Sequence, residues 1–113
     1  SELATMIAFI QQTAEKYRLK IGVFGHFGDG NLPPTFLCDE RNKDEIDRVH
    51  AAFREIFEKA IALGGTITGE HGVGLAKKEF LEKFAGKTSL DVMRALKRTL
   101  DPNNVLNPGK IFI

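Results

Sequence analysis

Residues 20–38 read KIGVFGHFGDGNLPPTFLC, and this stretch decides the fold. Two short apolar runs, 20–24 and 35–38, flank a loop made of glycines, polar residues and prolines. Short apolar runs bounded by turn residues are typical of strands. The loop is too long for a two-residue hairpin turn, and we expect Pro33 and Pro34 to interrupt ladder pairing because proline has no backbone N–H. The sequence therefore predicts two strands joined by a glycine-rich loop.

Helices are predicted on both sides of these strands. Before them, residues 2–16 carry apolar side chains at helical spacing, namely Leu3, Met6, Ile7, Ile10 and Ala14. After them, Asn42 and Glu45 resemble a capping box, in which each side chain bonds the backbone N–H of the other residue. This box opens a long amphipathic helix, and Gly64 and Gly65 close it, as left-handed helix ends favour glycine.

The C-terminal half is predicted to be mostly helical. A short strand is expected at TIT, residues 66–68, followed by a helix over about 75–84. Thr88 with Asp91 can cap a last helix, which Pro102 stops. This order predicts an α+β fold, a small antiparallel sheet with helices on one face. So few strands make a poor free-standing sheet, and we expect the chain to be a piece of a longer protein.

Composition narrows the classes of function. With 113 residues, 42% hydrophobic and 27% charged, the chain has the composition of one ordinary globular domain. Sixteen basic residues balance fifteen acidic ones and are scattered, so we expect no nucleic-acid or anionic-membrane surface. No apolar run approaches the ~18 residues of a membrane-spanning helix. The single cysteine, Cys38, is expected to be a buried strand residue in a reducing compartment.

Two glycine-rich loops are the candidates for a functional site. Each loop follows an apolar run and holds a histidine: His26 in GHFGDGN and His71 in TGEHGVG. Glycine lets a ligand or another backbone approach closely because it has no Cβ. The alternative is that the glycines only make tight turns. Asp29 and Asn31 are expected to organise the first loop, and His50 to be a surface or packing residue of the long helix.

Three kinds of chemistry compete for these loops. A phosphate cradle is disfavoured, because neither loop fits the glycine spacing of nucleotide-binding motifs. A metal site of His26, Glu70 and His71 has suitable ligands but uninformative spacing. Adjacent residues of an extended chain point to opposite faces, so Glu70 and His71 favour different roles. The third interpretation makes His71 a general base, because imidazole takes up a proton near neutral pH.

Three motifs together resemble the C-terminal part of the FAD-linked oxidases. They are GHFGDGN (25–31), GGTITGEHGVGLAKKEFL (64–81) and MRALKRTLDPNNVLNPGKIF (93–112), in this order. The similarity is to the group that contains the glycolate oxidase flavoprotein subunit and the D-lactate and D-2-hydroxyglutarate dehydrogenases. The resemblance implies an enzyme that oxidises a small 2-hydroxy acid, of the glycolate or D-lactate type, to a 2-oxo acid with hydride transfer to FAD.

The resemblance also implies how the chain is organised. Residues 1–100 would be the last part of a ferredoxin-like substrate cap domain, and residues 101–113 a tail that packs on an N-terminal FAD-binding domain outside this sequence. We expect the 113 residues alone to be inactive and to bind FAD weakly. Reduced flavin would pass electrons to a quinone, an iron–sulfur partner subunit or oxygen. A cytoplasmic protein is expected, associated with a membrane only through partners.

Individual roles follow from the same resemblance. His71 matches the base that deprotonates the substrate hydroxyl, and Asn107 and Lys110 match residues of the cofactor-facing tail. His26 and Glu70 match ligands of a zinc or manganese ion in the metal-dependent members of the family.

Pro33 stands where the family has a second motif histidine, and this departure leaves three outcomes open. The protein binds metal feebly, or it uses His26 and His71 without metal, or it is a divergent member with altered activity. A non-catalytic cap or interaction module is the alternative from another class, and a metal-dependent hydrolase is a weaker one.

Overall fold

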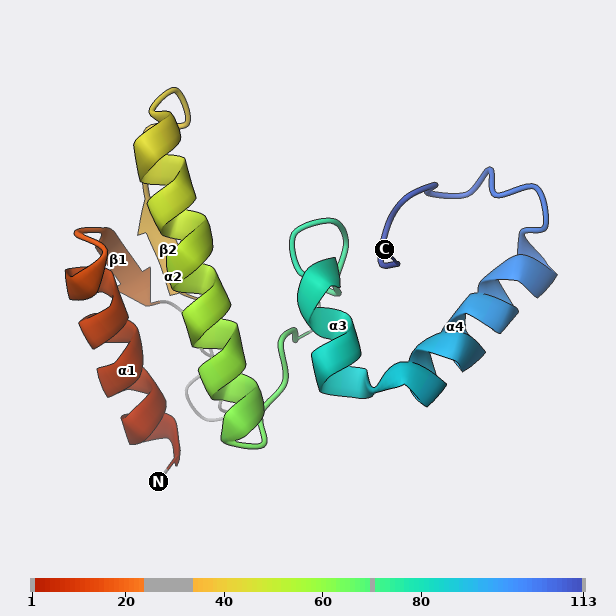
Figure 1. The fold of residues 1–113 in the computed structure, drawn as a ribbon, viewed down its shortest axis with the longest axis horizontal. Helices are drawn as coiled ribbons and strands as arrows, with labels where there is room; N and C mark the ends of the chain where they lie inside the picture. The colour runs from red at the N-terminus through yellow and green to blue at the C-terminus, as the bar shows by residue number, and fades with distance from the viewer. Residues whose placement is uncertain (1, 24–33, 70, 113) are drawn as a thin grey trace. The chain divides into compact units, whose positions relative to one another are not determined.

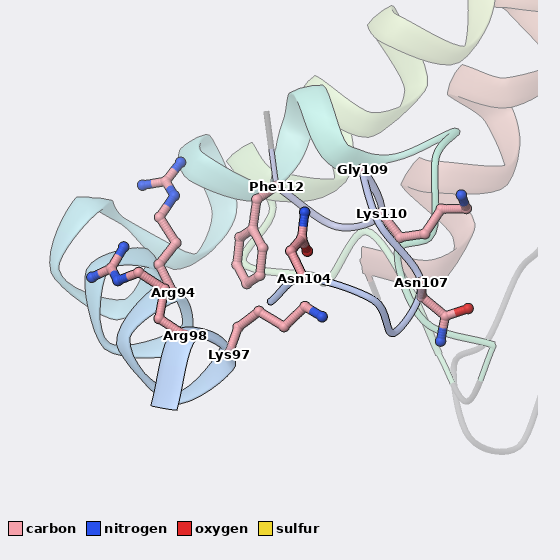
Figure 2. A pocket seen from close by; sticks show the side chains of 8 residues that line it. All are labelled: Arg94, Lys97, Arg98, Asn104, Asn107, Gly109, Lys110 and Phe112. Carbon is pink, nitrogen blue, oxygen red and sulfur yellow. The ribbon is translucent and has the colours of Figure 1, made fainter. Parts of the chain in front are cut away.

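The computed structural model describes residues 2–23, 34–69 and 71–112, which belong to two compact units, residues 1–64 and 65–113. The first unit (Figure 1) contains α1 (Glu2–Lys16), β1 (Lys20–Val23), β2 (Pro34–Leu37) and α2 (Lys43–Ala62). The second contains α3 (Lys78–Ala85), α4 (Lys87–Leu100) and a C-terminal tail, whose side chains near α4 are drawn in Figure 2. The predicted α+β fold with a small antiparallel sheet is confirmed.

The two strands pair in an antiparallel register, with Ile21 opposite Phe36 and Val23 opposite Pro34. The predicted interruption at Pro34 is therefore wrong. Pro34 is the first residue of an edge strand, a position where the missing N–H is tolerated. The expectation for Cys38 is also wrong: β2 ends at Leu37, and Cys38 is exposed in the segment between β2 and α2.

The core of the first unit is built by α1 and α2 together with the sheet. Buried apolar side chains from both helices form it, namely Ile10, Ala14, Val49, Ala52 and Ile56. Phe36 of β2 meets Phe53 of α2 edge-to-face, with ring centroids 4.9 Å apart, and Phe53 stacks on Phe57 at 5.7 Å. Such aromatic pairs contribute about 0.5–1.5 kcal/mol beyond their burial. This row of rings therefore fixes α2 against the strand pair.

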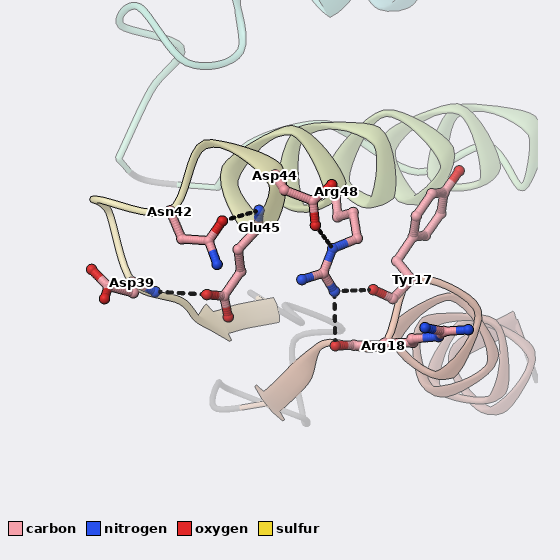
Figure 3. Close-up of polar contacts among 7 residues, drawn as sticks. All are labelled: Tyr17, Arg18, Asp39, Asn42, Asp44, Glu45 and Arg48. Atoms are coloured by element: carbon pink, nitrogen blue, oxygen red, sulfur yellow. Dashed lines mark hydrogen bonds and ion pairs between the residues drawn. The ribbon is translucent and has the colours of Figure 1, made fainter.

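The N-terminus of α2 is capped by Asn42, as predicted (Figure 3). The Asn42 Oδ1 accepts a hydrogen bond from the Glu45 N–H at 3.3 Å. The reciprocal half of the predicted capping box is wrong. The Glu45 carboxylate accepts instead from the Asp39 N–H at 3.2 Å, because the Asn42 N–H already donates to the Asp39 carbonyl at 2.9 Å.

Arg48 of α2 closes the C-terminal end of α1 (Figure 3). Its Nη1 donates to the carbonyl oxygens of Tyr17 at 2.7 Å and Arg18 at 3.1 Å, and its Nε donates to Asp44 at 3.1 Å. The last carbonyls of a helix have no partner within the helix. Here the chain also turns sharply, since Arg18 has a φ of 55°. The guanidinium therefore satisfies the exposed carbonyls and holds the start of β1 close to α2.

In the second unit, Gly86 ends α3 and begins α4. Its φ of 81° suits glycine, and no side chain caps α4. The predicted Thr88 cap is therefore wrong, because Thr88 lies inside the helix. α3 begins at Lys78 instead of near residue 75, because the backbone of Lys77, with φ −113° and ψ 0°, is still outside helical geometry. None of the described helices is long and apolar enough to cross a bilayer.

The predicted strand at residues 66–68 is also wrong. The Thr66 hydroxyl donates to the Thr68 carbonyl at 3.1 Å and accepts from the Thr68 N–H at 3.4 Å. Threonine hydroxyls that bond nearby backbone in this way offer the chain an alternative to ladder hydrogen bonds. The segment forms a local turn in place of a strand.

Glu55 of α2 joins the two helices of the first unit. Its Oε1 accepts hydrogen bonds from the Lys16 ammonium and the Tyr17 hydroxyl, both at 2.7 Å. Lys16, and after it Tyr17, hold the pKa of Glu55 below its usual range, while Glu55 raises the pKa of both donors. A depressed carboxyl pKa stabilises the fold above about pH 4, and raised donor pKa values stabilise it below about pH 10. The network therefore contributes fully only between these limits.

Glu55→Gln should lower the free energy of unfolding by about 0.5–1 kcal/mol at pH 7, a modest loss because the Lys16 side chain is 61% exposed. The difference from the wild type should shrink as the pH falls below about 4, where Glu55 itself becomes protonated. Asp47→Asn on the same helix is the control. Urea unfolding can be followed by fluorescence of Tyr17, the only tyrosine of a chain without tryptophan. Equal losses in the two variants would contradict this account of Glu55.

Candidate functional site

The structure describes only some of the residues that the sequence singles out. The following lie outside the described residues: His26, Asp29, Asn31, Pro33 and Glu70. His71 is exposed in the loop before α3, and Asn107 and Lys110 lie in the tail. All three belong to the second unit. His50 is exposed on α2, at the surface position predicted for it.

Thr68 organises the loop that carries His71. Its hydroxyl donates to the Gly72 carbonyl at 2.7 Å and accepts from the Lys77 ammonium at 3.3 Å. Gly72 and Gly74 have φ values of 76° and 56°, which glycine adopts without strain. The backbone directly after His71 is therefore held to Thr68, and His71 itself is exposed.

Asp101 controls the path of the tail. Asp101 is only 6% exposed. Its carboxylate accepts a hydrogen bond from the Lys97 ammonium. It also accepts from the backbone N–H groups of Val105 and Leu106, at 3.0 Å each. Lys97 first, and then the two backbone donors, hold the pKa of Asp101 below its usual range against the opposing effect of burial. The chain therefore turns back at the end of α4.

A backbone hydrogen bond joins the tail to the loop of His71. The Ile111 N–H donates to the Gly74 carbonyl at 2.8 Å, and the Lys78 ammonium donates to the Gly109 carbonyl at 3.3 Å. Ile111 has a φ of 68° at the centre of a tight turn, in which the Phe112 N–H donates to the Lys110 carbonyl at 2.7 Å. A β-branched residue in this conformation costs on the order of 1–3 kcal/mol, and such strain gathers at functional sites.

A pocket of about 270 Å³ lies between α4 and the tail (Figure 2). Asn107 and Lys110, the two predicted cofactor-binding residues, both line it, so the structure brings these two together. Three cationic side chains of α4 also line it: Arg94, Lys97 and Arg98. The pocket therefore presents several hydrogen-bond donors.

The donors of this pocket fit FAD. Amide and cationic side chains donate hydrogen bonds to phosphate and to carbonyl oxygens, which a flavin dinucleotide carries. Gly109, which also lines the pocket, has a φ of 74°, and a Cβ there would meet no atom within 4 Å. The wall of the pocket is open at this point, and a flat cofactor could approach the backbone.

The predicted metal ligands cannot be placed in the same way. Within residues 2–23, 34–69 and 71–112, no group of three His, Cys, Asp or Glu side chains could hold a metal ion. His26 and Glu70 lie outside these ranges. The metal site remains a prediction from the sequence.

Sequence reasoning missed Asp101 and the arginines of α4. Asp101 directly precedes Pro102 and two asparagines at the end of a helix, a composition that indicates a chain reversal. Arg94 and Arg98 are four residues apart on a helix, which places them on one side of it. That spacing could have suggested a basic face.

The chain belongs to the family of FAD linked oxidases, as their C-terminal domain: the model of that domain matches residues 1–111.

Individual relatives are similar over most of the chain. Glycolate oxidase subunit GlcD of Bacillus subtilis is 59% identical over 99% of this chain and 24% of its own length. D-2-hydroxyglutarate dehydrogenase of Stutzerimonas stutzeri is 42% identical over 79% of this chain and 20% of its own. The mitochondrial D-lactate dehydrogenase (cytochrome) of Arabidopsis thaliana is 35% identical over 99% and 20%. The chain thus spans about a quarter or less of the length of these relatives.

Asp101→Ala should release the tail, because the amides of Val105 and Leu106 lose their acceptor. We expect their hydrogen exchange, measured by NMR at neutral pH, to be about tenfold faster. In the wild type the same protection should be complete above about pH 4 and be lost only as the pH falls through the depressed pKa of Asp101.

Asp91→Ala is the matched control for this experiment. Asp91 is an exposed carboxylate of α4 that pairs with Lys87 and Arg94. Its removal should leave exchange at Val105 and Leu106 unchanged. Equal acceleration by both substitutions would show that the tail depends on the charge of α4 and not on the Asp101 hydrogen bonds.

Proposed function

We propose that this chain is the C-terminal part of an FAD-dependent enzyme that oxidises a small 2-hydroxy acid, of the glycolate or D-lactate type, to a 2-oxo acid. The observation that carries the proposal is the hydrogen bond between Ile111 and Gly74. It joins the loop of the predicted base, His71, to the tail of the predicted cofactor-binding residues, Asn107 and Lys110. The names of the relatives support the class of substrate.

In this proposal each residue has a defined task. His71 takes the proton from the 2-hydroxyl of the substrate, as an imidazole can near neutral pH. Asn107 and Lys110 donate hydrogen bonds to the polar groups of FAD. Bound FAD supplies the acceptor for the hydride from the α-carbon. The hydrogen bond from the Thr68 hydroxyl to the Gly72 carbonyl holds the backbone that follows His71.

The exposed surface of α4 in the second unit supports the proposal of a partner domain. α4 exposes three apolar side chains at four-residue spacing, Val92, Leu96 and Leu100. A stripe of this kind on a helix is typical of a packing surface. We propose that this stripe and the tail from residue 101 pack on an N-terminal FAD-binding domain of the same protein. Residues 1–100 then contribute the substrate cap, in a cytoplasmic protein that passes electrons to a further subunit or acceptor.

His71→Asn in the full-length flavoprotein should slow reduction of the flavin by substrate by about 100-fold or more, because a general base is lost. Stopped-flow absorbance of the flavin under anaerobic conditions measures this rate. His50→Asn, at the exposed histidine of α2, should leave it unchanged. If both variants reduce flavin at the wild-type rate, His71 is not the base.

Metal is expected to be held weakly. Pro33 leaves His26 and Glu70 as the only predicted protein ligands, and two ligands rarely retain zinc or manganese. Dialysed flavoprotein should therefore contain well below one equivalent of either metal by mass spectrometry. A full equivalent that is lost in His26→Ala would contradict this expectation and would add a metal to the site.

A further inference from the structure

The three carbonyl groups that follow His71 all accept hydrogen bonds, and their donors come from three different parts of the second unit. The donors are the Thr68 hydroxyl to Gly72 at 2.7 Å, the Lys77 N–H to Val73 at 3.3 Å and the Ile111 N–H to Gly74 at 2.8 Å. Only the first of these donors belongs to a side chain. A point substitution can therefore remove it and leave the two backbone bonds in place.

These hydrogen bonds select one conformation of a segment that glycine leaves free. Gly72 and Gly74 have φ values of 76° and 56°. A glycine adopts positive and negative φ about equally well, so the glycines alone do not determine the path of the chain after His71. The bonds to the three carbonyls supply that constraint.

Lys77 sets the direction of the bond that Thr68 makes. The Thr68 hydroxyl has one proton to donate, and its oxygen lies 2.7 Å from the Gly72 carbonyl and 3.5 Å from the Gly69 carbonyl. The Lys77 ammonium, 3.3 Å away, can only donate, so the hydroxyl oxygen accepts from it. A charged donor also polarises the hydroxyl and strengthens the bond that the hydroxyl donates. The proton of Thr68 is thereby directed to the closer carbonyl, that of Gly72.

The backbone of Thr68 is held as well. The Thr66 hydroxyl donates to the Thr68 carbonyl at 3.1 Å and accepts from the Thr68 N–H at 3.4 Å. Ile67, between them, is buried and anchors the segment in the core of the second unit. The Thr68 hydroxyl therefore has a fixed base from which to hold Gly72.

We propose that Thr68 is a positioning residue for His71 and that Lys77 orients its hydroxyl for this task. The inference rests on the proposed function, in which His71 is the base. Because Gly72 is bonded directly to His71, a held Gly72 carbonyl restricts the backbone from which the imidazole projects. A displacement of ~1 Å at a reacting group can cost about 100-fold in rate. In this role Thr68 acts through His71 and contacts neither substrate nor flavin.

Thr68→Val and Thr68→Ser in the full-length flavoprotein test the proposal, since valine lacks the hydroxyl and serine retains it. Thr68→Val should slow flavin reduction at saturating glycolate or D-lactate about tenfold, less than the full effect because the backbone bonds from Lys77 and Ile111 remain. The apparent Kd of the substrate should change by less than about twofold, because only the base is displaced. Thr68→Ser should stay within about twofold of the wild-type rate. Stopped-flow absorbance over a range of substrate concentrations separates the rate from the Kd.

Lys77→Met is the second variant, and it retains the Thr68 side chain if Thr68→Val does not fold. It should also slow reduction, and it should add nothing to a protein that already carries Thr68→Val, because Lys77 acts through the hydroxyl. Thr99→Val is the matched control. The Thr99 hydroxyl also donates to a carbonyl of the second unit, that of Ala95 at 2.9 Å, and its loss should leave the rate unchanged.

Hydrogen exchange in the ¹⁵N-labelled chain gives a measurement that needs no flavin. The amides of Lys77 and Ile111 donate to the same loop, and Thr68→Val should speed their exchange about threefold, whereas Thr99→Val should not.

Several results would overturn the positioning role. They are a wild-type rate in both Thr68→Val and Lys77→Met, equal slowing in Thr68→Val and Thr68→Ser, a lower rate matched by a higher Kd, and unchanged exchange in Thr68→Val. His71→Asn distinguishes this failure from that of the proposed function. Slow reduction in His71→Asn with a normal rate in Thr68→Val removes only the role of Thr68, whereas a normal rate in His71→Asn removes both.

Discussion

The buried carboxylate of Asp101 is the constraint on which the second unit depends. A carboxylate with so little contact to water is stable only if hydrogen bonds replace its hydration, and Lys97 and two tail amides supply them. Because those amides belong to Val105 and Leu106, satisfying the carboxylate also reverses the chain. The reversal brings Asn107 and Lys110 beside α4 and Ile111 to the loop of His71. One buried charge thereby organises the tail residues of the candidate site, while Thr68 organises the loop of His71.

The first unit has a related arrangement at the end of α1, in which a cationic side chain fixes the turn. There, the Arg48 guanidinium donates to the two carbonyls that follow α1, so the chain can turn into β1. In the first unit, a side chain distant in sequence satisfies carbonyls at a helix end. In the second unit, the residue that ends α4 satisfies two amides of the tail. The turns that follow are consequently fixed by charge-assisted hydrogen bonds and not by apolar packing alone. Such hydrogen bonds can fix a turn that remains at the surface.

Much of this architecture could be predicted from sequence, and the failures have identifiable causes. The periodicity of α1 and α2 and the Asn42 cap are local signals, and the structure confirms them. The predictions were wrong at Thr66, Thr68 and Thr88. Threonine occurs in strands, at helix caps and in local turns, and the surrounding chain determines which of these forms. Pro34 pairs because it begins an edge strand. The role of Asp101 depends on backbone amides that follow a turn, so no pattern of apolar spacing predicts it. For His71, Asn107 and Lys110, sequence resemblance named the residues, while the structure adds the hydrogen bond that links their segments.

The proposed function requires that this chain completes a flavin site for the oxidation of 2-hydroxy acids. Its most direct test is anaerobic mixing of the full-length flavoprotein with glycolate or D-lactate, unlabelled or deuterated at C2, while the flavin absorbance and the 2-oxo acid are recorded. We expect one equivalent of 2-oxo acid for each flavin reduced, and slower reduction by the deuterated substrate because the C2–H bond is broken. Flavin that stays oxidised with every small 2-hydroxy acid would contradict it.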